Sequence, residues 1–132
     1  MKEFHLQIVT PDGIAFDGMA ESLLVRGEAG DVEILAGHTD LFATLGIGRT
    51  RIKTATESRI ASSAGGFLSV ASGEVKLVAT TFEFADEINL ERAKTAKEKA
   101  EARIAAAKTD REITLAKAKL KRALNRMNVK EL

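Results

Sequence analysis

The chain has 132 residues, enough for one or two small domains with at least one sizeable core. Apolar residues make up 45% and charged residues 30%, proportions that exclude a disordered or fibrous protein. The net charge of +1 hides an asymmetry, because residues 1–89 carry 7 Lys and Arg against 13 Asp and Glu, whereas residues 90–132 carry 13 against 6. The basic second part, taken alone, indicates an anionic partner.

The sequence has no cysteine and no segment with the pattern of a secretory signal or a transmembrane helix. The absence of cysteine excludes a disulfide framework and a thiolate metal site or nucleophile. The N-terminal segment lacks a basic start followed by an apolar run, and no apolar stretch is long enough to span a bilayer as a helix. We therefore expect neither a secretory signal nor a transmembrane helix, and any connection with a membrane would pass through a partner.

Residues 1–84 have the pattern of short strands separated by turns. Phe4, Leu6 and Ile8 alternate with polar residues, as in a half-buried strand, and Pro11 and Gly13 fit a type I turn. Further strands are expected at residues 22–27, 31–35, 46–53 and 58–64, with a hairpin over 65–80. This spacing predicts an all-β antiparallel sandwich or barrel over residues 1–84.

Residues 85–132 are predicted to form two helices. Asn89 is a good N-cap for the first, and Thr109 with Glu112 forms a capping box that starts the second near Asp110. Two helices of about 18 residues with a tight turn between them predict an antiparallel hairpin. The expected apolar stripes are Ala93, Ala96, Ala100, Ile104 and Ala107 in the first helix, and Ile113, Ala116, Leu120, Ala123 or Leu124, and Met127 in the second.

The composition of these stripes predicts a weakly attached arm. Alanine keeps each helix intact by its high propensity, but an alanine seam removes little apolar area from water. The elements that move in conformational switches are usually those of low stability. The hairpin is therefore expected to be movable.

Signals for catalysis or metal binding are poor. The only histidines are His5 and His38, and a pair of His38 with Asp40 has no serine nucleophile in an elbow motif. No histidines or carboxylates have the spacing of metal ligands. We expect no catalytic residue, no metal site and no required cofactor.

Three arginines in the helical part form a candidate anion site. Arg92 lies in the first turn of the first helix, while Arg122 and Arg126 lie four residues apart on the second. In an antiparallel hairpin all three would converge close to Glu83, and a polyanion such as a nucleotide phosphate would relieve their mutual repulsion. The alternative is that all three point to solvent.

Four blocks of the sequence resemble the epsilon subunit of the bacterial F-type ATP synthase. They are "LQIVTPDG" at 6–13, "EAGDVEILAGHTDLFATLGIG" at 28–48, "SAGGFLSVASGEVKLVA" at 63–79 and "FADEINLERAKTAKEKAE" at 84–101, in the order of that family. The resemblance implies a ten-stranded sandwich over residues 1–84 and a helical hairpin over residues 85–132. This sequence departs from the family at Ala36, where proline is usual.

The resemblance also implies a role. Such subunits are non-catalytic parts of the central stalk, held peripherally on the cytoplasmic face of the membrane, that couple the gamma subunit to the c-ring. Their hairpin is a regulatory arm that inhibits ATP hydrolysis by reaching the alpha and beta subunits. The residues implied for contact with gamma or the c-ring are Glu28, Asp31, His38 and Asp40, and those for contact with beta are Lys117, Lys119 and Lys121, with Arg122 and Arg126.

Some members of the family bind ATP in the folded hairpin through the motif I/L-D-x-x-R-A, which here reads "INLERA". Asn89 replaces the aspartate, so the negative charge is lost, although an amide can still donate and accept hydrogen bonds. ATP is thus implied as a regulatory ligand that binds more weakly than with aspartate. The implied contacts are Glu83, Ile88, Asn89, Arg92, Ala93, Arg122 and Arg126.

One alternative function is a free-standing β-sandwich whose basic helical arm binds nucleic acid. The basic run "KAKLKRALNR" supports it. All six Phe lie before residue 85, however, and there is no Trp or Tyr, so the arm has no side chain on which a base could stack. The favoured interpretation is therefore the stalk subunit, without a nucleic-acid partner.

Overall fold

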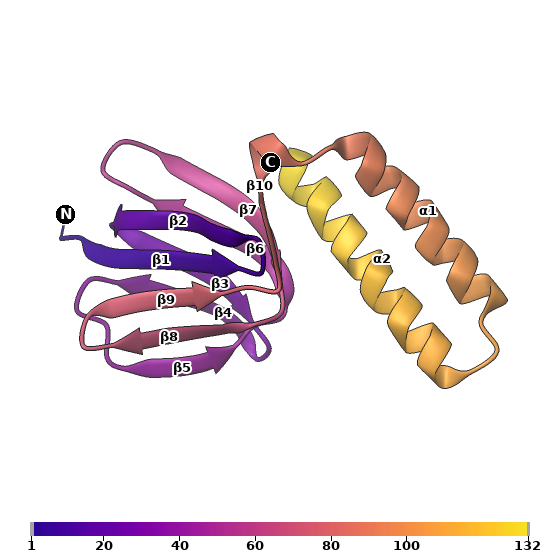
Figure 1. The fold of residues 1–132 in the computed structure, drawn as a ribbon, viewed down its shortest axis with the longest axis horizontal. Helices are drawn as coiled ribbons and strands as arrows, with labels where there is room; N and C mark the ends of the chain where they lie inside the picture. The colour runs from indigo at the N-terminus through magenta and orange to yellow at the C-terminus, as the bar shows by residue number, and fades with distance from the viewer. Residues whose placement is uncertain (1, 132) are drawn as a thin grey trace. The chain divides into compact units, whose positions relative to one another are not determined.

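The computed structural model describes residues 2–131, which divide into two compact units, one ending at Phe84 and one beginning at Ala85. The first unit consists of two five-stranded sheets packed face to face, and the second is a pair of helices (Figure 1). The predicted β-sandwich followed by a helical hairpin is confirmed.

Sheet A has the strand order β2-β1-β9-β8-β5, and sheet B has the order β10-β7-β6-β3-β4. Neighbouring strands are antiparallel except β1 and β9, which are parallel. The strands are β1 (Phe4–Thr10), β2 (Gly13–Ala20), β3 (Ser22–Gly27), β4 (Gly30–Leu35), β5 (Leu41–Thr44), β6 (Ile47–Lys53), β7 (Ser58–Ala64), β8 (Phe67–Ala71), β9 (Glu74–Val78) and β10 (Thr81–Phe84).

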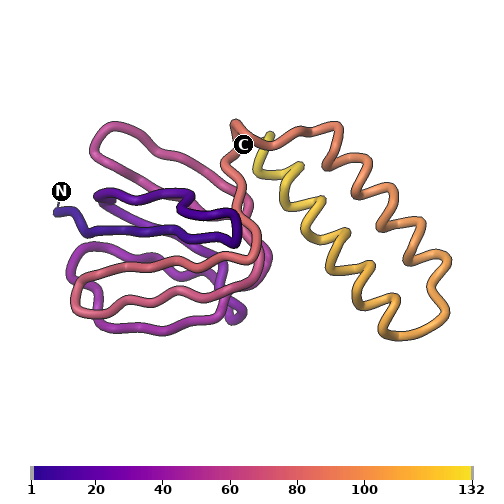
Figure 2. Tube along the Cα trace, in the orientation of Figure 1, coloured from indigo at the N-terminus to yellow at the C-terminus, as the bar shows by residue number. Residues whose placement is uncertain are grey.

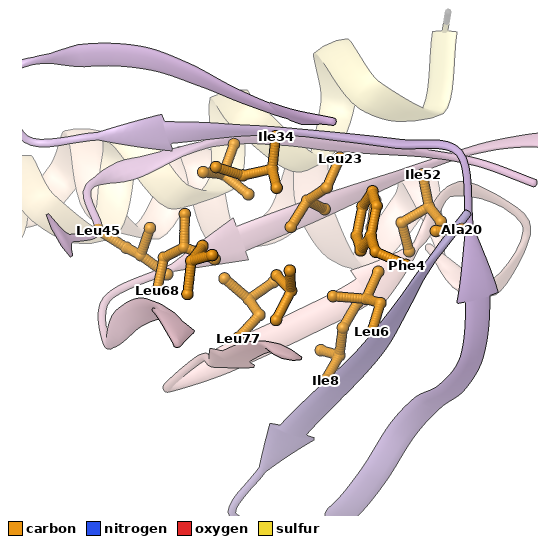
Figure 3. Close-up of a cluster of buried hydrophobic side chains, with 14 of the residues drawn as sticks. Phe4, Leu6, Ile8, Ala20, Leu23, Ile34, Leu45, Ile52, Leu68 and Leu77 are labelled. Carbon is orange, nitrogen blue, oxygen red and sulfur yellow. The ribbon is translucent and has the colours of Figure 1, made fainter. Parts of the chain in front are cut away.

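The core lies between the two sheets, where alternate residues of strands such as β1, β6 and β9 point inward (Figure 3). Leu6 and Ile8 of β1 are fully buried there, as are Leu23 of β3 and Leu77 of β9. The hydroxyls of Thr50 and Ser63 are also inside, 2.8 Å apart, so each satisfies the other. The alternation of Phe4, Leu6 and Ile8 in β1 predicted the buried face of that strand correctly.

Three strands were not predicted individually, and all are edge strands. In β2 the alternation is broken, because a bulge against β1 shifts the register between Ile8 and Val9. β5 and β10 have only four residues each. β10 pairs with β7 along its whole length, Phe82 and Phe84 meet edge to face, and the Arg59 guanidinium of β7 lies 3.6 Å from the Phe84 ring centre.

The helical unit begins with a short 3-10 helix, η1 (Ala85–Glu87), followed by α1 (Leu90–Ala106) and α2 (Asp110–Glu131). Asn89 caps α1, its side-chain oxygen accepting the Arg92 amide at 3.1 Å. At the start of α2, Thr109 Oγ1 accepts the Glu112 amide, as the capping box predicted. α2 is longer than predicted, at 22 residues, and Lys130 Nζ near its end donates to the Ala85 carbonyl of η1.

The seam between the helices is narrower than the predicted stripes. The buried alanines are Ala93 and Ala100 in α1, and Ala116 and Ala123 in α2, so each helix contributes two alanines seven residues apart. Ala96 of the predicted stripe is exposed. Of the two alternatives in the second helix, Ala123 is buried and belongs to the seam, whereas Leu124 is 37% exposed. The helices run antiparallel (Figure 2). From this direction and the equal seven-residue spacing we infer that Ala93 faces Ala123 and that Ala100 faces Ala116.

The turn between β7 and β8 depends on glycine. Gly66 has a φ of +91°, and a Cβ there would overlap the Val78 carbonyl oxygen. Gly73, in the turn between β8 and β9, has a similar φ of +81° but open space at the same position. Substitution of Gly73 therefore measures the energy of a left-handed backbone alone, and substitution of Gly66 adds the overlap of a Cβ with the Val78 carbonyl.

We predict that Gly66→Ala lowers the free energy of unfolding by roughly 2–4 kcal/mol, since it combines left-handed strain with a backbone overlap. Gly73→Ala, the matched control, should cost only about 1 kcal/mol because it carries the strain alone. Urea unfolding of both variants measures the difference. Equal losses would show that the close approach of the β7–β8 turn to β9 is unimportant.

His5 joins three strands of sheet A on its outer face. Its Nε2 lies 2.6 Å from Asp17 of β2, and its Nδ1 lies 2.6 Å from Glu74 of β9. The hydrogen bonds to Asp17 and Glu74 raise the pKa of His5 above its ordinary 6.5, and the hydrogen bond to His5 lowers the pKa of Asp17 below 3.8. The three side chains thus form a charged cluster, which we call the histidine cluster.

The histidine cluster predicts a pH-dependent contribution to stability. The contribution of His5 is full below pH 6.5 and disappears as the pH rises through its raised folded pKa. That of Asp17 is full above pH 3.8 and disappears as the pH falls through its lowered pKa. The cluster should therefore stabilise the sandwich most between these values.

Thermal unfolding of the wild type and of His5→Gln, from pH 5 to pH 9, tests this expectation. The melting temperature of the wild type should exceed that of the variant at acidic pH, and the gap should close with rising pH. In an Asp17→Asn, Glu74→Gln double variant, replacing His5 should make little difference at any pH. A gap that is independent of pH in the wild-type background would contradict this role.

Candidate functional site

The outer face of sheet A carries a continuous band of apolar side chains. Val9 of β1 pairs with Ile14 of β2 on one side and with Val78 of β9 on the other. Val78 pairs with Phe67 of β8, and the Phe67 ring stacks on Phe42 of β5 with centroids 5.1 Å apart. One residue from each of the five strands therefore forms this surface, which we call the apolar band.

The two ends of the band are its most exposed parts. Ile14 is 62% exposed and Phe42 66%, the highest values among the large apolar side chains that the structure describes as exposed. The histidine cluster lies farther along the same strands and supplies a polar border. An uncharged, aromatic-containing centre with polar groups beside it is the usual composition of a protein–protein interface.

Two of the predicted contact residues lie close together, Glu28 in the turn between β3 and β4 and Asp31 as the second residue of β4. Asp31 is paired across the hairpin with Arg26, whose Nε donates to its carboxylate at 2.5 Å. The Arg26 stem covers Gly48 of β6 so closely that a Cβ on Gly48 would overlap the Arg26 Cβ. The Asp31 charge is therefore balanced and its side chain is held in place.

The other two, His38 and Asp40, lie in the loop between β4 and β5. His38 Nδ1 donates to the Thr39 carbonyl at 2.6 Å. Asp40 Oδ1 accepts the Ser72 amide, which fixes the β8–β9 turn where Ser72 has a φ of +51°. The six residues of β4, about 20 Å of strand, separate this loop from the turn with Glu28, so the four residues form two pairs at opposite ends of a strand.

The hairpin has one cationic face, which follows from the alanine seam. In an antiparallel pair, residues one before or three after a seam alanine lie on the same face of both helices. Six of these eight positions are basic and the other two are Ala96 and Leu115. The basic residues of this cationic face are Arg92, Lys99, Arg103, Lys119, Arg122 and Arg126.

The seam also determines which arginines meet. Because Ala93 is level with Ala123, Arg92 falls at a level between Arg122 and Arg126, on the same face. The predicted convergence of these three side chains within the hairpin thus agrees with the helix geometry. Ile88 is buried and Ala93 is part of the seam, while the Asn89 side-chain oxygen is already engaged in capping α1. Glu83 belongs to the other unit, in β10.

The three lysines predicted to contact the beta subunit do not form one patch. All three are exposed on α2. Lys117 and Lys121 are four residues apart and share a face, whereas Lys119 lies on the cationic face. They are therefore two separate charged features of the same helix.

Within residues 2–131, no group of three or more His, Asp or Glu side chains could hold a metal ion. No helix in that part of the chain is long and apolar enough to cross a bilayer. The apolar band is the surface feature that sequence reasoning missed. Its signal was present in the outward positions of the strands, but which of these positions adjoin depends on strand order and register.

Comparison with known proteins covers both units. The family described as the ATP synthase delta/epsilon chain β-sandwich domain matches residues 3–85, and the delta/epsilon chain long α-helix domain matches residues 86–131. The ATP synthase epsilon chain of Bacillus velezensis is 41% identical over 129 residues, covering 98% of each chain. That of Caldicellulosiruptor saccharolyticus is 36% identical over 131 residues, covering 99% of this chain and 96% of its own.

Solved structures share the fold. A chain of the Euglena gracilis mitochondrial ATP synthase, OSCP/F1/c-ring, superposes with a TM-score of 0.79 at 20% identity, over 90% of this chain and 76% of its own. A chain of the Tetrahymena thermophila mitochondrial ATP synthase central stalk/c-ring superposes with a TM-score of 0.69 at 13% identity, over 98% of this chain and 97% of its own.

These matches span the sandwich and the hairpin together and confirm the resemblance seen in the four sequence blocks. They give no support to the alternative of a nucleic-acid-binding protein. The chain belongs to the ATP synthase delta/epsilon family and is a member of its bacterial epsilon chains.

Proposed function

We propose that this chain is a non-catalytic subunit of the central stalk of an F-type ATP synthase, where its sandwich couples gamma to the c-ring. The apolar band carries this proposal. It spans all five strands of sheet A, has exposed aromatic and aliphatic ends, and would lose contact with water on binding a larger partner. We assign the band to gamma, because a permanent partner suits an uncharged surface.

The end of the β3–β4 hairpin with Glu28 and Asp31 is the proposed contact with the c-ring. The Asp31 carboxylate is held by Arg26, so this end of the β3–β4 hairpin is rigid. Glu28 in the turn supplies a second carboxylate. His38 and Asp40, at the opposite end of β4, cannot share that contact and belong to a second edge of the sandwich beside gamma. The subunit would be held at the cytoplasmic face of the membrane through these contacts alone.

The hairpin is the proposed regulatory arm that inhibits ATP hydrolysis by reaching alpha and beta. Four alanine methyl groups form the centre of its seam, and Val129 near the end of α2 is the one larger side chain that is fully buried among the described residues of the two helices. Less apolar burial therefore opposes separation of the helices than in a leucine seam. Lys117 and Lys121 on one face, with Lys119 and Arg122 on the cationic face, would contact acidic segments of beta once the arm extends.

ATP is the proposed regulatory ligand of the closed hairpin. Arg92, Arg122 and Arg126 meet on one face at one level, a geometry that suits a polyphosphate. Asn89 caps α1 with its oxygen, which leaves its amide group to contact the nucleotide. An aspartate there would also cap the helix and would add the charge that orients Arg92.

For the gamma contact, we predict that Phe42→Ser and Ile14→Ser each weaken binding of the full chain to gamma by about tenfold, the loss expected for one exposed apolar anchor of an interface. Leu115→Ser is the matched control, because Leu115 is 54% exposed but lies on α2 of the hairpin, away from the surfaces assigned to gamma. Surface plasmon resonance with immobilised gamma measures the affinities. Unchanged binding by both band variants would reject the band as the gamma surface.

For the nucleotide, we predict that titration calorimetry detects ATP binding that Arg92→Ala abolishes and Asn89→Asp strengthens. The same titration with Arg111→Ala should match the wild type, since Arg111 lies in the first turn of α2, at the far end of the hairpin. No heat of binding at millimolar ATP would remove the regulatory ligand from the proposal, without affecting the gamma contact.

A further inference from the structure

A groove lies at the turn end of the hairpin, between the last turn of α1 and the first turns of α2. Its volume is about 310 Å³, at the lower limit of the range for small-molecule sites. It lies nearer the turn than the arginines assigned to ATP, because its lining includes the seam residue Ala116 and not Ala93 or Ala123, and its Lys119 is one helical turn from Arg122. The lining residues are Arg103, Ala106, Ala107, Glu112, Leu115, Ala116 and Lys119.

The apolar part of the groove has an unusual side chain at its edge. Leu115 precedes a seam alanine, the position that is filled by Arg92, Lys99 and Arg122 at the other three seam alanines. It is 54% exposed, so its side chain is available to a ligand. Together with the alanine methyl groups it gives the cationic face a single apolar site.

The charge of the groove is positive. Arg103 and Lys119 stand at equivalent positions, each three residues after a seam alanine, and so lie on the same face on either side of the groove. The one acid of the lining, Glu112, keeps its charge while its Oε2 accepts the Lys108 amide at 2.8 Å, so two cations against one carboxylate leave the lining with a net charge of +1. An apolar floor between two cations is complementary to a molecule with an alkyl chain and an anionic head.

We propose that this groove binds a small anionic amphiphile of the medium-chain fatty acid class. The carboxylate lies between Arg103 and Lys119, and the alkyl chain covers Leu115 and the alanines of both helices. Because the ligand touches α1 and α2 together, it stabilises the closed hairpin at the end where the seam offers least burial. The binding requires no other subunit.

Calorimetric titration of the full chain with decanoate at low ionic strength tests the proposal. We expect saturable binding of one decanoate. Leu115→Ser removes the apolar contact with the alkyl chain and Lys119→Glu removes a cation beside the carboxylate, so each should weaken binding about tenfold. Leu124→Ser and Lys117→Glu are matched controls that make the same changes on the opposite face of α2, and they should bind decanoate like the wild type. Circular dichroism of each variant checks that the helices are retained.

Two further probes on the wild type identify the chemistry even if a variant unfolds. Decyltrimethylammonium has the same chain with a positive head, and acetate has the head without the chain, so both should bind at least about tenfold more weakly than decanoate. Equal binding of the two decyl probes, or equal weakening by the variants and their controls, would overturn the proposal. Retention on anionic phospholipid vesicles without binding of decanoate would also overturn it, in favour of a membrane surface.

Discussion

The close approach of two helices through alanine is the constraint on which the helical unit depends. Ala93 and Ala100 meet Ala123 and Ala116 because the same seven-residue spacing occurs in both helices, and the pairing fixes their relative level and rotation. Every other property of the hairpin follows from that registration. It collects six basic residues on one face and leaves Leu115 as the only large apolar side chain among them.

The seam and the cationic face act against each other. Burial of a few methyl groups favours closure only slightly, while like charges on one face oppose it. Anions that touch both helices change this balance toward the closed form by binding it preferentially. We therefore expect a hairpin of this composition to respond to such ligands, whereas a hairpin with a leucine seam would stay closed in their absence.

The sandwich differs from the hairpin in this respect, since its core is formed by large side chains such as Leu6, Ile8 and Leu77, all fully buried. A rigid support allows one sheet face to carry two distinct surfaces. The apolar band lies across five strands, and the histidine cluster ties three of them together farther along. A sandwich with a core of large side chains and a hairpin with an alanine seam suit the coupling and regulatory roles proposed for them.

The sequence by itself determined the elements with strong local signals: the alternation in β1, the N-cap at Asn89, the capping box at Thr109 and Glu112, and the basic character of the arm. It also carried the family resemblance, and through it the ten strands that the alternation alone did not resolve. Only the tertiary structure decided that Asp31 pairs with Arg26, that Asp40 holds the Ser72 turn, and that Phe42 stacks on Phe67. These contacts join residues through strand order, register and helix rotation, which arise from packing of the whole chain and are not encoded in any one segment.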